Sequence, residues 1–326
     1  MASIAIVGGG SIGVGWALVF ARGGFDVALH EPDAERRREA PADLRRRLDS
    51  LAAGGILAEA PETVAARVRF DDTLAAAVMD AMHVQECAPE RLELKQALFR
   101  ELDTLAAADA TLASSSSALT TSEIASGLES RARCIVAHPG NPPYLLPIVE
   151  LVPAEFTDPA VVERTASLLA AAGMSPVRVR REVEGFVFNR LQGALLREAY
   201  CLVRDGVASV EDVDRVVRDG LGRRWAVVGP FETAALNTRG GIEAHAAIMG
   251  PAYARMGADR GQRDPWTPDL VERVARELNQ RMPPERWAER VAWRDDALIA
   301  LERARRESGL FARSSPSDQR KEESTC

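Results

Sequence analysis

The start of the chain combines two apolar runs, a glycine-rich turn and a single acid in an order that few folds accommodate. An apolar run at 4–7 leads into a turn with glycines at positions 8, 9, 10 and 13. A helical pattern follows, and a second apolar run at 25–29 ends shortly before Glu31. Strand, glycine turn, helix, strand and acid in this order are typical of a βαβ unit that binds a dinucleotide. We therefore predict a Rossmann-type sheet at this end of the chain.

Each part of the glycine turn has a separate physical role. Gly8 allows the tight turn, Gly10 lets the backbone approach a pyrophosphate, and Gly13 lets the helix lie close to the strand. The helix then begins at Ser11 and Ile12, where free backbone N–H groups and the positive end of the helix dipole favour phosphate binding. The turn therefore predicts a binding site for the phosphates of a dinucleotide.

Glu31 distinguishes between the two common dinucleotides. It lies about 20 residues after the turn, where a carboxylate accepts hydrogen bonds from both ribose hydroxyls. The same charge repels a 2′-phosphate, so the sequence favours NAD over NADP. The alternative is a glycine-rich turn in an unrelated α/β protein that binds no nucleotide.

The composition excludes several classes of protein. The chain has 326 residues, of which 46% are hydrophobic, and this is enough for one large or two medium domains with a real core. No apolar run has the length of a membrane span, and the N-terminus lacks the pattern of an export signal. Four cysteines lie far apart without metal-ligand spacing, and the net charge of −7 argues against nucleic acid as a partner. We therefore expect a cytoplasmic protein with free thiols, no metal and no contact with a membrane.

The pattern of elements changes near Glu184. Strand-like and helical stretches alternate over 1–113, the last predicted strand covers 177–183, and almost everything beyond it is helical. The chain is thus predicted to be α/β, with a mostly parallel sheet followed by an all-α domain. The predicted parts are a NAD-binding Rossmann-type domain at 1–184, a helical domain at 185–313 and a disordered polar tail at 314–326.

A run of serines follows a predicted strand at 111–113. Residues 114–117 are all serine, and the segment from Thr120 to Glu123 has the form of a helix capping box. The serines then lie at the carboxyl end of a parallel strand, where α/β sheets bind their ligands. The alternative is a polar turn without a function.

Two polar residues interrupt apolar strands on either side of a proline-rich loop. His138 ends a strand that starts at Cys134, and Glu150 lies inside the strand at 148–152. The loop is short enough to fold these strands side by side, which would bring the imidazole and the carboxylate within hydrogen-bond distance. A buried carboxylate needs a partner, and a carboxylate that fixes one ring nitrogen makes the other a better base. The pair is therefore a candidate general base, and the alternative is a structural ion pair.

Three further features have both a functional and a structural interpretation. Asn189 opens a long helix, where it can cap the helix or hold a substrate oxygen. Arg223 and Arg224 lie in a glycine-containing loop, and we select Arg224 as the candidate for a substrate carboxylate, although surface arginines are common in this chain. The arginines of the helical stretch 36–48 can hold an anion, but the acids between them favour a solvated helix face.

Taken in order, these motifs resemble the L-3-hydroxyacyl-CoA dehydrogenase family. The likeness extends over nearly the whole chain and is carried by the segments at 7–13, 113–117, 138–142, 148–152 and 185–191. Three more segments resemble its lambda-crystallin branch, which includes L-gulonate 3-dehydrogenase, and they lie at 220–225, 229–233 and 293–295. The resemblance implies an NAD-dependent enzyme for a small hydroxy acid, and a homodimer built through the helical domain.

The resemblance also implies roles for single residues. His138 is the general base, and Glu150 orients it and stabilises its positive charge. Ser117 holds the reacting oxygen, and Asn189 positions the substrate.

On the cofactor side, the resemblance assigns three more positions. Glu90 and Lys95 match residues near the cofactor ribose and nicotinamide, and Asn141 falls in the loop on the cofactor side. Lysine occurs only at positions 95 and 321 of this arginine-rich chain, and a cofactor role offers a reason for the first of them.

Two departures from the acyl-CoA enzymes bear on the substrate. Those enzymes carry asparagine where Ser115 stands and serine where Ala118 stands, so we include Ser115 among the substrate residues. They also have a lysine-rich stretch, suited to CoA phosphates, where this chain has 48–55 without a lysine. We therefore predict oxidation of the 3-hydroxyl of a small free L-3-hydroxy acid. The alternatives are a 3-hydroxyacyl-CoA dehydrogenase and a non-catalytic structural protein, because the branch includes a lens protein.

Overall fold

The computed structural model describes residues 3–260, 267–281 and 283–308. The chain divides into two compact units, which are described separately below. Unit 1 contains the residues up to Arg190 together with Asp295–Glu307, and unit 2 contains Leu191–Arg294. The sequence analysis assigned 185–313 as a whole to the helical domain, so the return of Asp295–Glu307 to unit 1 is a feature that it did not anticipate. The predicted tail at 314–326 lies outside the described residues.

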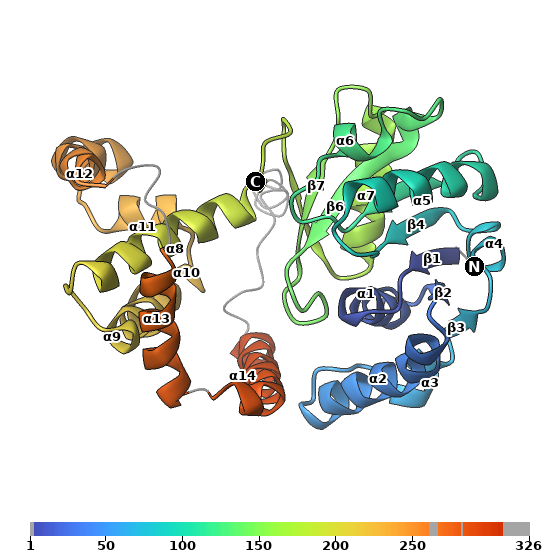
Figure 1. Ribbon diagram of the computed structural model, residues 1–326, viewed down its shortest axis with the longest axis horizontal. Coiled ribbons are helices and arrows are strands. Elements are labelled where there is room, and N and C mark those ends of the chain that lie inside the picture. Colours follow the sequence, from blue (N-terminus) through green and yellow to red (C-terminus); the bar gives the residue numbers. More distant parts are fainter. Residues whose placement is uncertain (1–2, 261–266, 282, 309–326) are drawn as a thin grey trace, which may run out of the picture. The chain divides into compact units, whose positions relative to one another are not determined.

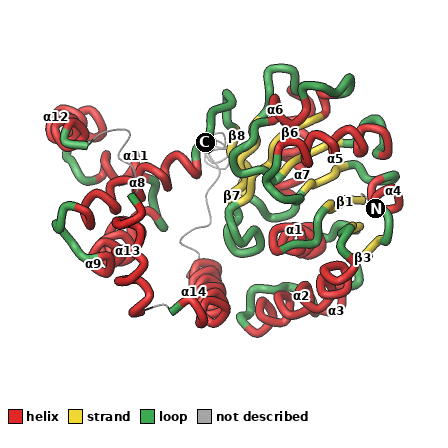
Figure 2. The backbone as a smooth tube through the Cα atoms, viewed as in Figure 1, coloured by secondary structure: helices red, strands yellow, loops and turns green. Residues whose placement is uncertain are grey.

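A single eight-stranded sheet forms the centre of unit 1 (Figures 1 and 2). Its spatial order is β3-β2-β1-β4-β5-β6-β7-β8, and all neighbours run parallel except β6 and β7, which are antiparallel. The strands are β1 (Ser3–Val7), β2 (Asp26–His30), β3 (Val68–Asp71), β4 (His83–Glu86), β5 (Thr111–Ser114), β6 (Cys134–Pro139), β7 (Ile148–Val152) and β8 (Ser175–Arg178). The predicted α/β class with a mostly parallel sheet is confirmed.

Helices cover both faces of this sheet. The helices of unit 1 before Arg190 are α1 (Ser11–Arg22), α2 (Ala34–Ala53), α3 (Pro61–Ala65), α4 (Leu74–Val78), α5 (Leu92–Leu105), α6 (Thr121–Ala125) and α7 (Pro159–Ala171), with a short 3-10 turn at Arg131–Arg133. One hydrophobic core joins α1, α2, α3 and α7 to one face of the sheet, and a second joins α4, α5 and α6 to the other. Alternate residues along each strand face opposite cores, which explains why the buried strands are apolar almost throughout.

The last strand differs from the prediction. The sequence analysis placed it at 177–183, whereas β8 ends at Arg178. Its partner β7 stops at Val152, so pairing ends there, with one more backbone hydrogen bond from Val179 to Leu151. An edge strand is only as long as its neighbour allows, and this limit cannot be seen in its own sequence.

Every element described from Leu191 to Arg294 is helical, as predicted for this part. The elements are α8 (Phe188–Arg204), α9 (Val210–Val216), a π-turn at Val217–Leu221, α10 (Gly222–Trp225), α11 (Pro230–Leu236), α12 (Gly241–Ala258), α13 (Pro268–Arg281), a 3-10 turn at Pro284–Arg286 and α14 (Trp287–Ser308). α8 begins in unit 1, and residues Asp295–Glu307 of α14 belong to unit 1. None of the described helices is both long and apolar enough to cross a membrane.

The glycine turn between β1 and α1 is as crowded as the motif predicts. Gly8 has a φ of +112°, and a Cβ on Gly13 would lie 1.8 Å from the Gly8 carbonyl oxygen. A Cβ on Gly10 would meet nothing within 4 Å. Gly13 is therefore required for packing of the turn itself, whereas Gly10 leaves space on the outer side of the turn.

We expect Gly13→Ala to lower the free energy of unfolding by about 1–3 kcal/mol or more, because the atom in its way belongs to the backbone and cannot move aside cheaply. Gly10→Ala is the matched control and leaves stability unchanged, since Gly10 has an ordinary φ of −71° and open space around it. Urea unfolding of both variants measures the difference. Equal midpoints would contradict this account of the turn.

Candidate active site and cofactor site

The carboxyl ends of the parallel strands meet at one edge of the sheet. There, the residues that follow β1, β2 and β4 surround a cavity of about 720 Å³ whose lining includes Gly8, Gly10, Glu31 and Cys87. α5 closes one side of it with Leu94 and neighbouring side chains. The crossover between β1 and β4 makes this edge the point where an open α/β sheet binds its ligand.

The start of α1 at this cavity has the properties of a phosphate site. Gly10 is the N-cap of α1, and among the described residues no side-chain hydrogen bond caps the N–H groups of the first turn. The free N–H groups of that turn therefore stay available for an anion, and the open side of Gly10 gives an anion room to approach. Ser11 is exposed at the first position of the helix, and Ile12 packs partly against the core.

Glu31 lies where β2 ends, and its side chain is buried in the wall of the cavity. Oε2 accepts a 2.6 Å hydrogen bond from the backbone N–H of Gly9, and Oε1 accepts one of 3.0 Å from Asp33. These bonds hold the carboxylate beside the glycine turn, and each oxygen keeps a second lone pair for a ribose hydroxyl.

The loop that carries Ser117 is organised around Glu90. Oε1 of Glu90 accepts hydrogen bonds from the Ser116 hydroxyl at 2.6 Å and from the backbone N–H groups of Ser117 and Ala118 at 3.0 Å each. Burial raises the pKa of Glu90, but these donors and the nearby Lys95 outweigh it and lower the pKa below its usual range. The carboxylate that the resemblance places near the ribose is therefore also the anion around which the serine loop folds.

Lys95 lies inside the unit, with 1% of its side chain exposed. Its Nζ donates to both carboxylate oxygens of Glu86, at 2.8 and 3.0 Å, and to the carbonyl of Ala88 at 3.0 Å. Glu86 is fully buried and also accepts from the Ser114 hydroxyl. All three ammonium hydrogens thus have protein acceptors, and Lys95 lies between Glu86 and Glu90.

The hydroxyl of Ser115 is oriented by its neighbours. Its oxygen accepts from Trp16 Nε1 at 3.1 Å and from Gln85 Nε2 at 2.7 Å, which occupies both lone pairs. The hydroxyl proton is then left for Cys87 Sγ, 3.3 Å away, or for a ligand. Burial raises the pKa of the Cys87 thiol to about 12, so the thiol stays protonated at neutral pH. Cys87 therefore lines the cavity without acting as a nucleophile.

His138 and Glu150 are directly opposite each other in the antiparallel β6–β7 pair. His138 Nδ1 lies 2.8 Å from Glu150 Oε2, and both side chains are buried. Within the part of the chain that the structure describes, the other ring nitrogen, Nε2, has no hydrogen-bond partner. The two strands that sequence analysis expected to lie side by side therefore do so, and they leave one imidazole nitrogen available.

The second oxygen of Glu150 holds the start of α8. Oε1 accepts from the backbone N–H groups of Val187 at 2.7 Å and Phe188 at 2.9 Å. Burial raises the pKa of Glu150, but the hydrogen bonds from His138 and from these two N–H groups outweigh it, and the pKa lies below its usual range. Glu150 is therefore a carboxylate at neutral pH.

The turn before α8 is conformationally demanding. Gly185 has a φ of +74°, and Phe186 is a buried non-glycine residue with a φ of +49°. The Phe186 ring lies 5.7 Å from the His138 ring between centroids. A bulky residue in the left-handed region costs on the order of 1–3 kcal/mol and is retained where the surroundings require it. Here the turn places two backbone N–H groups within hydrogen-bond distance of Glu150 and the Phe186 ring beside the ring of His138.

Asn189 connects α8 to the serine loop. Its Nδ2 donates a 2.9 Å hydrogen bond to the carbonyl of Ser117. The helix start is capped by Glu150, so Asn189 does not act as the cap that sequence analysis offered as one interpretation. Its side-chain oxygen is left to accept from a ligand.

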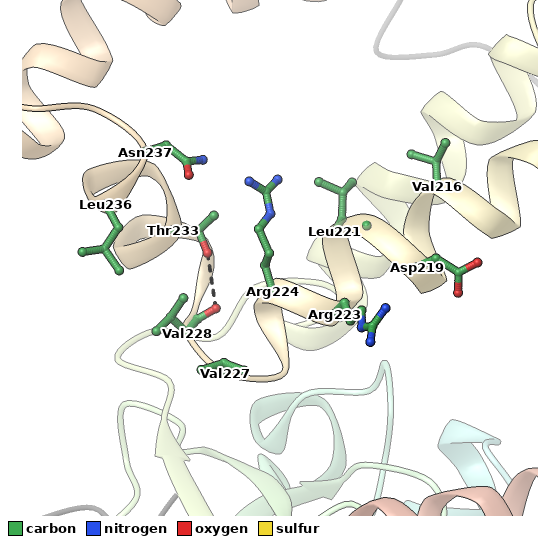
Figure 3. Close-up of a pocket in the computed structure, with 11 residues that line it drawn as sticks. Val216, Asp219, Leu221, Arg223, Arg224, Val227, Val228, Thr233, Leu236 and Asn237 are labelled. Carbon is green, nitrogen blue, oxygen red and sulfur yellow. Dashed lines mark hydrogen bonds between the residues drawn. The ribbon is translucent and has the colours of Figure 1, made fainter. Parts of the chain in front are cut away.

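The remaining candidates lie on surfaces. Asn141 is exposed in the loop between β6 and β7. Arg224, on α10 of unit 2, points into the opening of a cavity of about 850 Å³, whereas Arg223 points in another direction (Figure 3). The apolar wall of this cavity consists of Val216, Leu221, Val227, Val228 and Leu236, and Thr233 and Asn237 add polar atoms.

Sequence analysis missed two residues that shape the site. Glu86 and Gln85 are fully buried at the end of β4, the first as the partner of Lys95 and the second as a donor to Ser115. The signal was present, because two polar residues end a strand that is buried in the sheet, just as the polar Glu150 lies inside the apolar strand β7.

Comparison with known proteins assigns most of the chain to one family. Residues 3–183 match the NAD binding domain of 3-hydroxyacyl-CoA dehydrogenase, and residues 185–282 match its C-terminal domain. The chain belongs to the 3-hydroxyacyl-CoA dehydrogenase family. It is an NAD-dependent dehydrogenase of the 3-hydroxy-acid type, and its cofactor is NAD.

Three relatives show how this member of the family compares with others. The lambda-crystallin homolog of Mus musculus is 41% identical, over 91% of this chain and 94% of its own. The L-carnitine dehydrogenase of Mesorhizobium japonicum is 34% identical, over 91% of this chain and 81% of its own. The crystal structure of 5-formyl-3-hydroxy-2-methylpyridine 4-carboxylic acid 5-dehydrogenase, an NAD+-dependent dismutase, superposes with a TM-score of 0.79 at 30% identity, over 93% of this chain and 98% of its own.

The cavity at the sheet edge fits this cofactor. The uncapped start of α1 and the open side of Gly10 suit the pyrophosphate, and the buried Glu31 carboxylate suits the adenosine ribose. Glu31 also gives the site a negative charge where NADP would carry its 2′-phosphate.

We expect Lys95→Met to lower the free energy of unfolding by about 3–5 kcal/mol, because it leaves the Glu86 carboxylate buried without its cation. The double variant Glu86→Gln/Lys95→Met removes both charges and should recover most of that loss. Urea unfolding compares the two. A single variant as stable as the wild type would show that the pair is not what holds Lys95 inside.

Proposed function

We propose that the protein oxidises the 3-hydroxyl of a small, free L-3-hydroxy acid with His138 as the general base. The observation that carries the proposal is the 2.8 Å contact between His138 Nδ1 and Glu150, with Nε2 left without a protein partner among the described residues. L-gulonate is the substrate type that the lambda-crystallin branch suggests, and the lambda-crystallin homolog of Mus musculus is 41% identical to this chain.

The pair determines which way a proton moves. Because Glu150 is ionised, it accepts the Nδ1–H of His138, and this tautomer leaves the lone pair on Nε2. Nε2 then takes the proton of the substrate hydroxyl, and the positive charge that forms on the ring lies beside the Glu150 carboxylate. A positioned base of this kind contributes on the order of 10²–10⁴-fold to the rate.

Bound at the cavity lined by Gly10 and Glu31, NAD would supply the acceptor for the hydride of the substrate carbon. The chain's own residues must then stabilise negative charge on the substrate oxygen as the proton leaves. Ser117 supplies a hydroxyl in this role, and the bond from Asn189 to the Ser117 carbonyl, together with the Glu90 bond to its N–H, fixes that residue from both sides. Loss of one such donor costs about 2.7–4 kcal/mol in comparable sites.

A free acid is favoured over a CoA thioester by two features. The stretch at 48–55, where acyl-CoA enzymes are lysine-rich, has none here, and α14 packs on part of it, since a Cβ on Gly54 would meet Ile299 at 2.0 Å. Arg224 offers a guanidinium to a substrate carboxylate, and L-carnitine, in the name of one relative, is not a CoA ester. A 3-hydroxyacyl-CoA substrate remains the second candidate because the family carries that name.

We also propose that the protein forms a homodimer through unit 2. Unit 2 exposes many large apolar side chains, with 82% of Phe231, 72% of Leu236 and 66% of Ile248 accessible. Apolar surface on this scale marks a site for another protein chain. A dimer would cover it.

We expect His138→Gln to bind NADH as the wild type does and to lose turnover by on the order of 10²-fold or more, because glutamine cannot take the hydroxyl proton. NADH fluorescence measures binding, and NADH absorbance with a panel of hydroxy acids measures turnover. A variant that keeps more than about a tenth of the wild-type rate would rule out His138 as the base.

We expect Arg224→Met to raise the KM for a free hydroxy acid by about tenfold to a hundredfold, as for the loss of one charged hydrogen-bonding pair. Arg223→Met is the matched control, since Arg223 is the neighbour of Arg224 on α10 and points in another direction (Figure 3). Assays of free acids beside 3-hydroxybutyryl-CoA decide the substrate class. An unchanged KM in the Arg224 variant removes its role, and turnover of the thioester alone favours the second candidate.

A further inference from the structure

One arginine of the arginine-rich helix α2 differs from its neighbours. Arg45 and Arg46 are exposed and pair with acids on the surface, Arg45 with Asp49 and Glu62 and Arg46 with Asp43. The side chain of Arg47 is only 13% exposed. Solvation of a charged helix face therefore explains the first two arginines but not the third.

Arg47 lies against the first residue of α1. Its Nη1 donates to the carbonyl of Ser11 at 2.9 Å, and its Nη2 donates to the Ser11 hydroxyl oxygen at 3.1 Å. Asp43, one turn earlier on α2, pairs with the same guanidinium at 2.7 Å. The guanidinium thus stands at the end of α1 that the cofactor phosphates approach.

The other side of the guanidinium is covered by Tyr144. The Arg47 guanidinium carbon lies 5.3 Å from the centre of the Tyr144 ring, which is a cation–π distance. Arg22 of α1 donates to the Tyr144 carbonyl at 2.7 Å, so the ring is fixed at its backbone as well. Burial raises the pKa of Tyr144, and its hydroxyl therefore stays a donor.

The hydroxyl of Tyr144 donates to Asp295 Oδ2 at 3.0 Å. Asp295 begins the part of α14 that belongs to unit 1, and two further contacts hold that part in place. Ile299 is buried against Gly54, and Arg306 donates to the carbonyl of Ile56 at 2.9 Å. A continuous series of contacts therefore joins the C-terminal helix to the start of α1.

We propose that Arg47 is a positioning residue of the NAD pyrophosphate site, and that Asp295 and Tyr144 hold it there. Because the Ser11 oxygen accepts from Arg47, the Ser11 hydroxyl proton is directed away from the guanidinium and is free to donate to a phosphate oxygen. The guanidinium adds positive charge to that of the helix end, and Asp43 offsets only part of it.

The inference goes beyond the proposed function, since it concerns the cofactor phosphates and not the substrate or the base. It also assigns α14 a role in cofactor binding. This helix begins after the last residue matched to the family's C-terminal domain. The competing interpretation is a brace between α1 and α2 with no effect on phosphate binding.

The test is the binding of ADP-ribose and of adenosine to the full chain, by calorimetry. ADP-ribose carries the pyrophosphate, whereas adenosine fills the same ribose site without it. For Arg47→Gln we expect the Kd of ADP-ribose to rise about fivefold to tenfold and that of adenosine to stay within twofold. Arg38→Gln, an exposed arginine of the same helix, is the charge-matched control and leaves both unchanged.

Two results would overturn the role of Arg47. One is unchanged affinity for ADP-ribose, and the other is an equal loss for both ligands with a lower Tm, which is the outcome for a brace alone. Arg47→Lys keeps the charge without the two-pronged contact and should restore part of the affinity. His138→Gln binds ADP-ribose normally in either case, so failure here is separate from failure of the proposed function.

The link to α14 is tested by Tyr144→Phe and Asp295→Asn. Each should weaken ADP-ribose binding by about twofold to fivefold, less than Arg47→Gln, because the guanidinium remains but loses its support. Asp296→Asn changes the adjacent exposed acid and is the control. If Asp295→Asn binds ADP-ribose with wild-type affinity while Arg47→Gln binds it more weakly, α14 has no part in cofactor binding. The proposed role of Arg47 then still holds.

Discussion

The geometry of the candidate active site depends on the hydrogen bonds that the two oxygens of the Glu150 carboxylate accept. One fixes the imidazole of His138, and the other fixes the first N–H groups of α8. Through α8 the same carboxylate sets Asn189, which binds the Ser117 carbonyl. The proposed base, the start of α8 and the serine loop therefore depend on one buried charge, and three donors stabilise that charge.

The single antiparallel pair in the sheet makes this arrangement possible. In a purely parallel sheet, residues at the carboxyl ends of neighbouring strands come from separate loops. Here β7 returns beside β6, so that His138 and Glu150 face each other across the ladder. Elsewhere in the same sheet, the parallel strands β1 and β2 end at the dinucleotide cavity, at Gly8 and Glu31. One sheet thus carries both the dinucleotide cavity and the His138–Glu150 pair.

Local motifs could be predicted from the sequence, and long-range partners could not. The glycine turn, the Thr120–Glu123 capping box and the His138–Glu150 pair each follow from residues that are close in the chain or joined by one short loop. The end of β8 and the return of Asp295–Glu307 to unit 1 depend on surfaces formed by distant segments. The hydrophobic pattern of α14 does not predict that Asp295–Glu307 belongs to unit 1, because one continuous helix contains residues of both units.

Two acid–base pairs are buried within the part of the chain that the structure describes, and their difference explains what each can do. In the pair of Lys95 with Glu86, every ammonium hydrogen has an acceptor inside the protein. Lys95 therefore has no hydrogen positioned for transfer to a ligand. In the pair of His138 with Glu150, the acid is fully occupied but the base keeps one nitrogen without a partner among the described residues. A lone lysine and a lone histidine look equally conspicuous in a sequence. The number of hydrogen-bond partners distinguishes the two residues. Lys95 has a partner for every hydrogen and a structural role, whereas His138 has a ring nitrogen that can accept a proton.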